Sequence, residues 1–110
     1  MANDTAVAGS THIRSALAEV DKALAARPHT DGHIFSVAAH ALAAARDDMT
    51  LRQRETGSTA ETRRRIEHVN AAISVVLGAH FPLGEVPWQE LEKARDWLAG
   101  LIGDEGDRDG

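Results

Sequence analysis

The sequence predicts an all-α fold, an up-down-up-down antiparallel four-helix bundle, and three observations support that prediction. Four stretches carry apolar residues alternating three and four positions apart, the spacing that lines one face of a helix. The segments between them are short, so consecutive helices are expected to run in opposite directions. The 110 residues include 20 alanines and only 4% aromatics, which favours closely packed helices over a β-sandwich. Helical hairpins completed by dimerisation are an alternative arrangement.

One domain is expected, because a chain of 110 residues has room for a single compact core. We expect it to span residues 10–102. Residues 1–9 are small, polar and aperiodic, and residues 103–110 are polar and acidic. Neither segment can bury enough apolar surface to become ordered, so both ends are predicted to be disordered.

The first helix is expected at residues 11–27. Ser10 or Thr11 can serve as its N-cap, and Pro28 ends it because proline lacks a backbone donor. Its apolar face comprises four residues: Ile13, Leu17, Val20 and Leu24.

The second helix is expected to begin after residues 30–32, where Thr30 or Asp31 can accept hydrogen bonds from the first-turn amides. Its pattern fades after Leu51, and Gly57 is suited to end it. Five residues form its apolar face: Phe35, Ala38, Leu42, Ala45 and Met49.

The third helix is expected at residues 59–79. Ser58, followed three residues later by Glu61, has the spacing of a capping box, in which each side chain bonds the other residue's backbone amide. The apolar spacing predicts that five residues face the core: Ile66, Val69, Ile73, Val76 and His80.

The third connection is apolar for a loop, so Phe81, Leu83 and Val86 are expected to fold over the end of the core. Pro87 suits the first position of a fourth helix, which is expected to end at Gly103. The face of this helix comprises Leu91, Ala94, Leu98 and Leu101.

Composition excludes several classes of function. The chain has no cysteine, which excludes disulfides, thiolate metal sites and cysteine nucleophiles. It has no apolar run of membrane-spanning length and no secretory leader pattern, so we expect a cytoplasmic protein without membrane contact. A net charge of −5 disfavours nucleic acid as a partner. The abundance of alanine and the preference for arginine over lysine indicate GC-rich coding and a bacterial or phage origin.

A His and carboxylate cluster is one candidate ligand site. In an antiparallel bundle the first and third connections lie at the same end, which brings together His29, His33, His80 and Glu85. Imidazoles and carboxylates suit a divalent metal such as zinc. The alternative is that these are polar side chains at loop ends, and no cofactor is expected.

Five arginines around the second connection are a candidate contact for a polyanion: Arg52, Arg54, Arg63, Arg64 and Arg65. Helix ends that meet at one turn would concentrate their charge. The alternative is a solvated charged surface that pairs internally with Asp47, Asp48 and Glu55.

The sequence lacks a nucleophile elbow, a phosphate-binding glycine loop and a zinc-protease helix, so no enzymatic activity is expected. Tryptophan is enriched at interface hot spots. We therefore expect a non-catalytic interaction or regulatory module that forms a homodimer or binds another protein through Phe81, Leu83, Trp88, Trp97 and Leu101. Two alternatives stay open. Both tryptophans could lie along the bundle flank, or the function could be binding a small ligand or metal at the His cluster.

Overall fold

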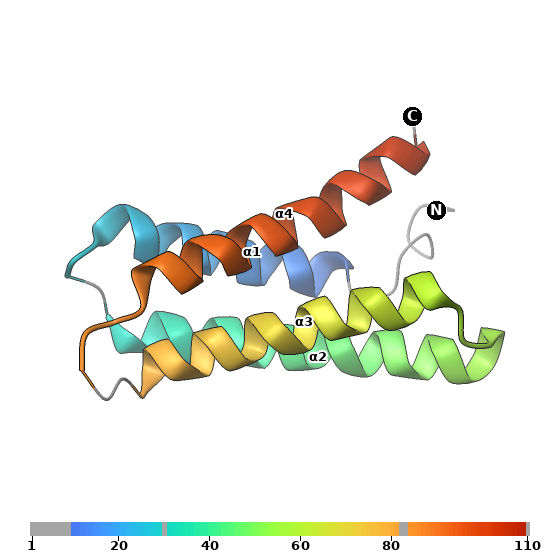
Figure 1. Cartoon of the computed structure of the whole chain (residues 1–110), viewed down its shortest axis with the longest axis horizontal. Helices are drawn as coiled ribbons and strands as arrows, with labels where there is room; N and C mark the ends of the chain where they lie inside the picture. Colours follow the sequence, from blue (N-terminus) through green and yellow to red (C-terminus); the bar gives the residue numbers. More distant parts are fainter. Residues whose placement is uncertain (1–9, 30, 82–83, 110) are drawn as a thin grey trace.

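Four helices build the described part of the chain (Figure 1). The computed structural model describes the backbone of residues 10–29, 31–81 and 84–109, and the side chains of residues 11–29, 31–81 and 84–102. The helices are α1 (Ser10–Ala26), α2 (Gly32–Thr56), α3 (Ala60–His80) and α4 (Trp88–Asp109). These ranges contain no strand, and the predicted all-α four-helix class is confirmed.

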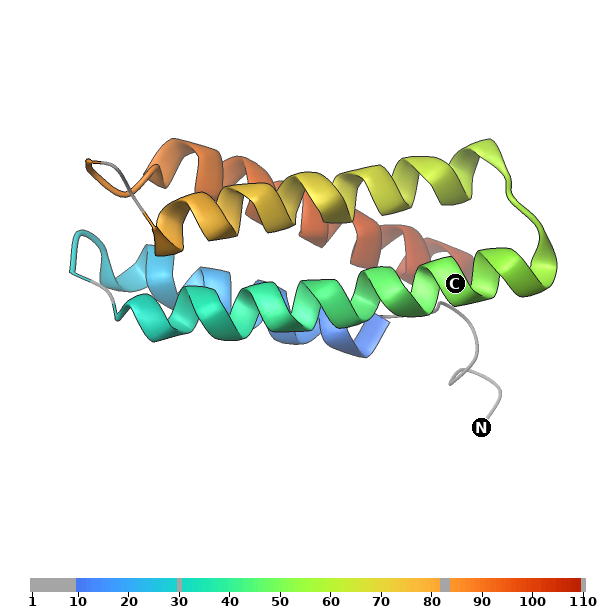
Figure 2. The same ribbon diagram turned by 90° about the horizontal axis from the view of Figure 1, so that it is seen from below.

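The helices surround one core, and the chain reverses direction at each connection, as Figures 1 and 2 show. Helix α1 contacts α2 and α4, and α3 contacts the same two helices. Over the described residues, the backbones of α1 and α3, and those of α2 and α4, do not approach each other closely, so these pairs lie diagonally across the bundle. None of the described helices combines the length and the apolar character needed to cross a lipid bilayer.

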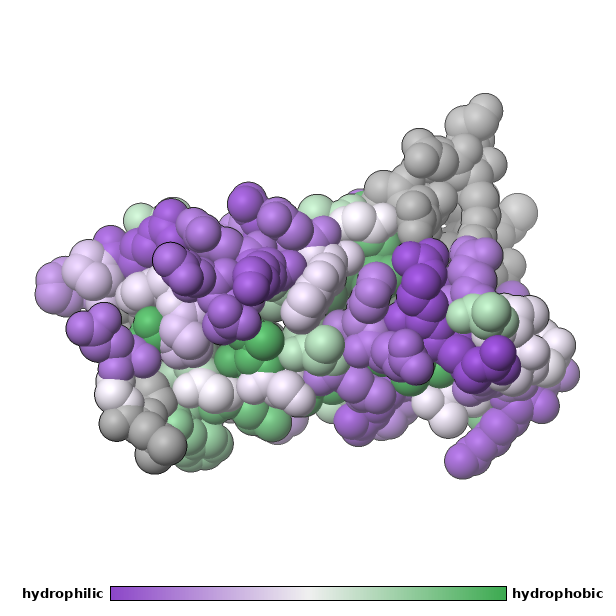
Figure 3. All heavy atoms as spheres, in the orientation of Figure 1, coloured by the Kyte–Doolittle hydropathy of each residue, from purple (hydrophilic) through white to green (hydrophobic). Residues whose placement is uncertain are grey.

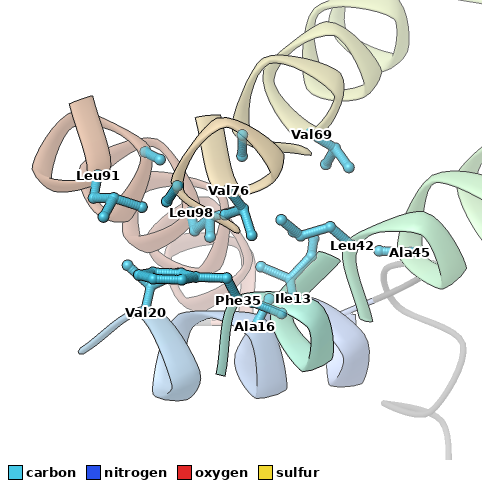
Figure 4. Packing of buried hydrophobic residues seen from close by; sticks show 14 of the residues in the cluster. Ile13, Ala16, Val20, Phe35, Leu42, Ala45, Val69, Val76, Leu91 and Leu98 are labelled. Atoms are coloured by element: carbon cyan, nitrogen blue, oxygen red, sulfur yellow. The ribbon is translucent and has the colours of Figure 1, made fainter. Parts of the chain in front are cut away.

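The predicted apolar faces of α2 and α4 are the buried faces. All five predicted positions on α2 and all four on α4 are buried. Phe35 and Leu42 from α2 lie in the same cluster as Leu91 and Leu98 from α4 (Figure 4). Complete burial of such side chains contributes about 1.5–3 kcal/mol each, so this cluster is the main source of stability.

Helix α1 buries a wider face than the sequence predicted. Ile13, Val20 and Leu24 are buried as expected, and Leu17 is only partly buried. Ala16 and Ala23, which were not predicted, are fully buried. Small side chains let neighbouring helices approach closely, so these alanines lie at the contacts.

Helix α3 is rotated relative to the prediction. Val69 and Val76 are buried as expected, but Ile66, Ile73 and His80 are only partly buried. The remaining buried positions are Arg65, Ala72 and Ala79. Both sets have the spacing of a helical face and share the two valines, so spacing alone does not distinguish them. The prediction chose the set with the larger isoleucines. Close packing against the neighbouring helices selects the alanine side instead.

The ends of α2 agree with the sequence. The Asp31 side chain accepts a hydrogen bond of 2.9 Å from the His33 amide, which makes Asp31 the N-cap. Thr30, the other candidate, lies outside the described residues. At the far end the Gly57 amide donates to the Gln53 carbonyl at 2.8 Å, and Gly57 has a φ of 95°.

The predicted capping box of α3 is wrong. Thr59 is the N-cap, and its hydroxyl accepts from the Thr62 amide at 3.1 Å. The Ser58 hydroxyl instead accepts from Gln53 Nε2 at 2.6 Å and from Arg63 Nη1 at 2.9 Å. Ser58 therefore ties the end of α2 to the start of α3, and the capping role moves to the next residue.

Three further helix ends differ from the prediction. Helix α1 begins at Ser10, so Thr11 lies inside the helix. Pro87 lies just before α4, and its carbonyl accepts from the Leu91 amide at 3.0 Å. Helix α4 continues to Asp109 instead of ending at Gly103.

Candidate interaction site

A groove between α2 and α3 is the candidate interaction site. It opens to solvent and has a volume of about 430 Å³. We call it the α2–α3 groove. Its lining residues are Ser36, Ala39, His40, Ala43 and Arg46 from α2, and Ile73, Leu77, His80 and Phe81 from α3 and the residue after it.

The groove exists because its two walls differ in size. On the α2 side, Ala39 and Ala43 are one turn apart and leave a trough. On the other side, Ile73, Leu77 and Phe81 follow one another at intervals of four residues. Leu77 is 41% exposed and Phe81 is 70% exposed. Apolar side chains gather over the C-terminal half of α3, whereas hydrophilic side chains cover the N-terminal half of α4 (Figure 3).

Backbone hydrogen bonds hold the two imidazoles of the groove in place. His80 Nδ1 lies 3.0 Å from the Gly32 carbonyl oxygen, and His40 Nδ1 lies 2.9 Å from the Ser36 carbonyl oxygen. A carbonyl oxygen can only accept, so Nδ1 is the donor in both rings. The Phe81 ring packs edge-on against His80, with ring centroids 4.3 Å apart. The apolar end of the groove is therefore fixed to the N-terminus of α2.

Charge is unevenly placed in the groove. Arg46 is the only lysine, arginine or carboxylate residue among its lining residues. Its Nε lies 3.6 Å from Asp47 Oδ1, and both side chains are exposed. No carboxylate lines the groove, although the chain as a whole carries 17 acidic and 12 basic residues.

The predicted partner surface is only partly accessible. Phe81 is exposed and does not fold over the core, so the prediction of an apolar lid is wrong at this residue. Leu101 is 2% exposed and belongs to the core, which corrects its assignment to a partner contact. Trp88 and Trp97 are partly buried against the core. Leu83 lies outside the described residues.

Trp97 also packs on the neighbouring helix. Its ring stacks on His68 of α3 with a centroid distance of 6.2 Å. A smaller pocket of about 240 Å³ lies beside this pair, lined in part by Arg64 and Asp96. These contacts agree with the alternative in which the tryptophans widen the core along the bundle flank.

The four residues of the predicted metal site do not gather as ligands. His29, His33 and Glu85 are exposed, and His80 is directed to the Gly32 carbonyl. Asp31, their neighbour, is engaged as the N-cap of α2. Within the described ranges, no three or more His, Asp or Glu side chains are placed to hold a metal ion.

The arginines of the predicted polyanion contact divide into two groups. Arg65 is only 7% exposed and lies on the buried face of α3, so its assignment to the surface is wrong. Arg52, Arg54, Arg63 and Arg64 are exposed around the second connection. The rotation of α3 explains the difference, because it turns Arg65 inward and leaves its neighbours in solvent.

Sequence reasoning missed the α2–α3 groove, although a signal was present. Ile73 and Leu77 on α3, continued by Phe81 just after it, form a second apolar line beside the Val69 and Val76 face. No protein-family model, no curated protein and no solved structure matches this chain. The chemistry of the groove is therefore the basis for assigning a function.

Proposed function

We propose that the protein is a non-catalytic interaction module that receives an amphipathic helix of a partner protein in the α2–α3 groove. The observation that carries this proposal is the exposure of Leu77 and Phe81 beside the small residues Ala39 and Ala43. Covering a large apolar side chain contributes up to about 1.5–3 kcal/mol. A cytoplasmic location and a bacterial origin, expected from composition, are part of the same proposal.

The length and spacing of the groove suit a helix. Its α2 wall extends from Ser36 to Arg46, which corresponds to about 15 Å along a helix axis. Along α2 the lining residues recur every three or four positions, like the ridge of a helix that packs beside another helix. A docked helix with apolar residues at i, i+3 or i+4, and i+7 would cover this length.

A second copy of the chain is a poorer occupant of this groove. A twofold interface uses the same surface on both subunits, so it would bury two Arg46 side chains in one interface. No lining carboxylate is present to pair with them. Self-association through α4 is a separate proposal that rests on Trp88 and Trp97, and both of these pack partly against their own core.

Site-specific crosslinking in the cells that make the protein tests the proposal. A photoreactive phenylalanine analogue replaces Phe81 in one variant and Leu51 in a control variant. Leu51 is 55% exposed on α2 and does not line the groove. We expect position 81 to give a discrete adduct with another protein and position 51 to give none. The crosslinked peptide should come from a segment with helical apolar spacing.

A second substitution shows whether the adduct depends on the groove. Leu77→Glu should remove the adduct at position 81, because it places a charge on the apolar wall. Leu51→Glu adds the same charge outside the groove and should leave the adduct unchanged. The proposal is wrong if position 81 gives no adduct, if both positions give the same adducts, or if the adduct joins two copies of this chain.

A further inference from the structure

We infer that the docked segment is a helix with a carboxylate at one end of its apolar seam, where it meets Arg46, and an apolar anchor at the other end, where it meets Phe81. This inference rests on the proposed function and names the chemistry of the segment that the groove receives. It follows from the difference between the two ends of the groove.

The two ends are far apart along α2. The hydrogen bond from His80 to Gly32 places the Phe81 end at the N-terminus of α2. Arg46 lies well along the same helix and lines the other end of the groove. The α2 wall spans about 15 Å, so the anchor and the carboxylate should be separated by about ten or eleven residues of a docked helix. Positions i and i+11 lie on the same helical face, because three turns contain about 10.8 residues.

Arg46 is suited to recognise a carboxylate. Its guanidinium can donate two parallel hydrogen bonds to one carboxylate. Its present contact is an exposed pair with the adjacent Asp47 at 3.6 Å. Exposed pairs of this kind contribute little to stability, so exchanging this one costs little. A docked helix would also exclude water, which strengthens the new pair.

The two imidazoles of the groove are already hydrogen-bonded. His40 and His80 both donate through Nδ1 to backbone carbonyl groups. The Nδ1 donors of both rings are therefore already engaged. Arg46 is the only permanently charged residue of the groove lining, so the carboxylate is expected at its end.

The net charge of the chain helps to distinguish a local preference for a carboxylate from nonspecific electrostatic attraction. At −5, the overall field attracts basic peptides and repels acidic ones. A preference for acidic residues at one peptide position would therefore run against the global charge. Such a preference would have to come from a local contact.

A displayed peptide library tests the inference. Helix-forming peptides of about 15 residues, or about 23 Å, are selected against the full chain. We expect selected peptides to share an apolar seam with Glu or Asp enriched ten or eleven residues from one apolar anchor. Replacing that acid by its amide should weaken binding about tenfold or more, as measured by fluorescence anisotropy. The same replacement should change affinity less than about twofold when the chain carries Arg46→Gln.

The controls separate the inference from the proposed function. Leu77→Glu should abolish binding of the selected peptides, and Leu51→Glu should preserve it. If no selected peptide depends on Leu77, the proposed function is wrong. If the peptides depend on Leu77 but show no acidic position, or if Arg46→Gln leaves the acid preference unchanged, the inference is wrong and helix docking stands. Circular dichroism of each variant verifies that its fold is retained.

Discussion

The outer surface where α1 meets α4 and the α2–α3 groove are built from the same kind of helix pair, yet they present opposite chemistry. Just after α1, Arg27 Nη1 lies 2.8 Å from Glu92 Oε2 of α4, and between the two helices Arg95 Nη1 lies 3.9 Å from Asp21 Oδ1. The α2–α3 groove is lined mainly by small and apolar residues, with Arg46 at one end. Figure 3 shows part of this contrast, with hydrophilic side chains over the N-terminal half of α4 and apolar ones over the C-terminal half of α3.

The contrast shows how one backbone arrangement yields a solvated surface and a docking surface. Long charged side chains such as Arg27 can lay their apolar stems over hydrophobic surface while their charged groups stay in water. Ala39 and Ala43 are too short to cover anything, so the neighbouring Leu77 stays accessible. At these two surfaces, side-chain length and charge decide which one leaves apolar side chains exposed.

The largest expected effect tests whether Leu77, on the wall of the groove, belongs to the surface or to the core. Leu42→Ala removes a fully buried side chain from α2, and we expect a loss of about 2–5 kcal/mol in the free energy of unfolding. Leu77→Ala, at a position that is 41% exposed, should cost less than about 1 kcal/mol. Urea unfolding of both variants measures the difference. Equal losses would show that Leu77 belongs to the core, and the contrast between the two surfaces would fail.

The next effect concerns the turn that joins the two walls of the groove. Gly57 has φ 95° and ψ 158°, a region that is almost restricted to glycine, and open space surrounds its Cβ position. Gly57→Ala should therefore destabilise the fold by about 1–3 kcal/mol through backbone strain. Gly78→Ala in α3 meets equally open space and should stabilise the fold by up to about 1 kcal/mol. Thermal unfolding distinguishes these results, and a neutral Gly57→Ala would contradict this account of the turn.

The smallest expected effect concerns the charged surface. A double-mutant cycle with Arg27→Ala and Glu92→Ala should give a coupling free energy of about 0.2–1 kcal/mol, because both side chains are exposed. Added salt should reduce the coupling. Chemical unfolding at low and high ionic strength measures both quantities. A coupling of several kcal/mol that resists salt would show that this pair holds the end of α1 against α4 and does not behave as a solvated surface pair.

The sequence correctly predicted the buried face of each helix whose large apolar residues all lie on one side. It was less accurate where small and large residues compete for burial. Phe35 and Leu42 on α2, and Leu91 and Leu98 on α4, leave only one face that can be buried. On α3 two overlapping faces share the same valines. Hydropathy favoured Ile73 over Ala72, while close packing buries Ala72.

The candidate site was predictable only in part. Phe81 was expected to contact a partner, and its exposure makes it available. The α2–α3 groove escaped prediction because it needs Ala39 of one helix beside Leu77 of another. That neighbourhood depends on the rotation of α3, which also turned Arg65 inward and removed it from the expected charged surface.

Local chemistry in the sequence determined the number of helices, the caps at Asp31 and Gly57, and the two dominant apolar faces. These features depend on spacing and on side chains within one or two turns, so they can be read along the chain. The tertiary structure decided the rotation of α3, the role of Ser58 between two helices, and the groove beside Leu77. Each of these depends on how closely two helices approach, and that distance is set by packing between residues far apart in the sequence.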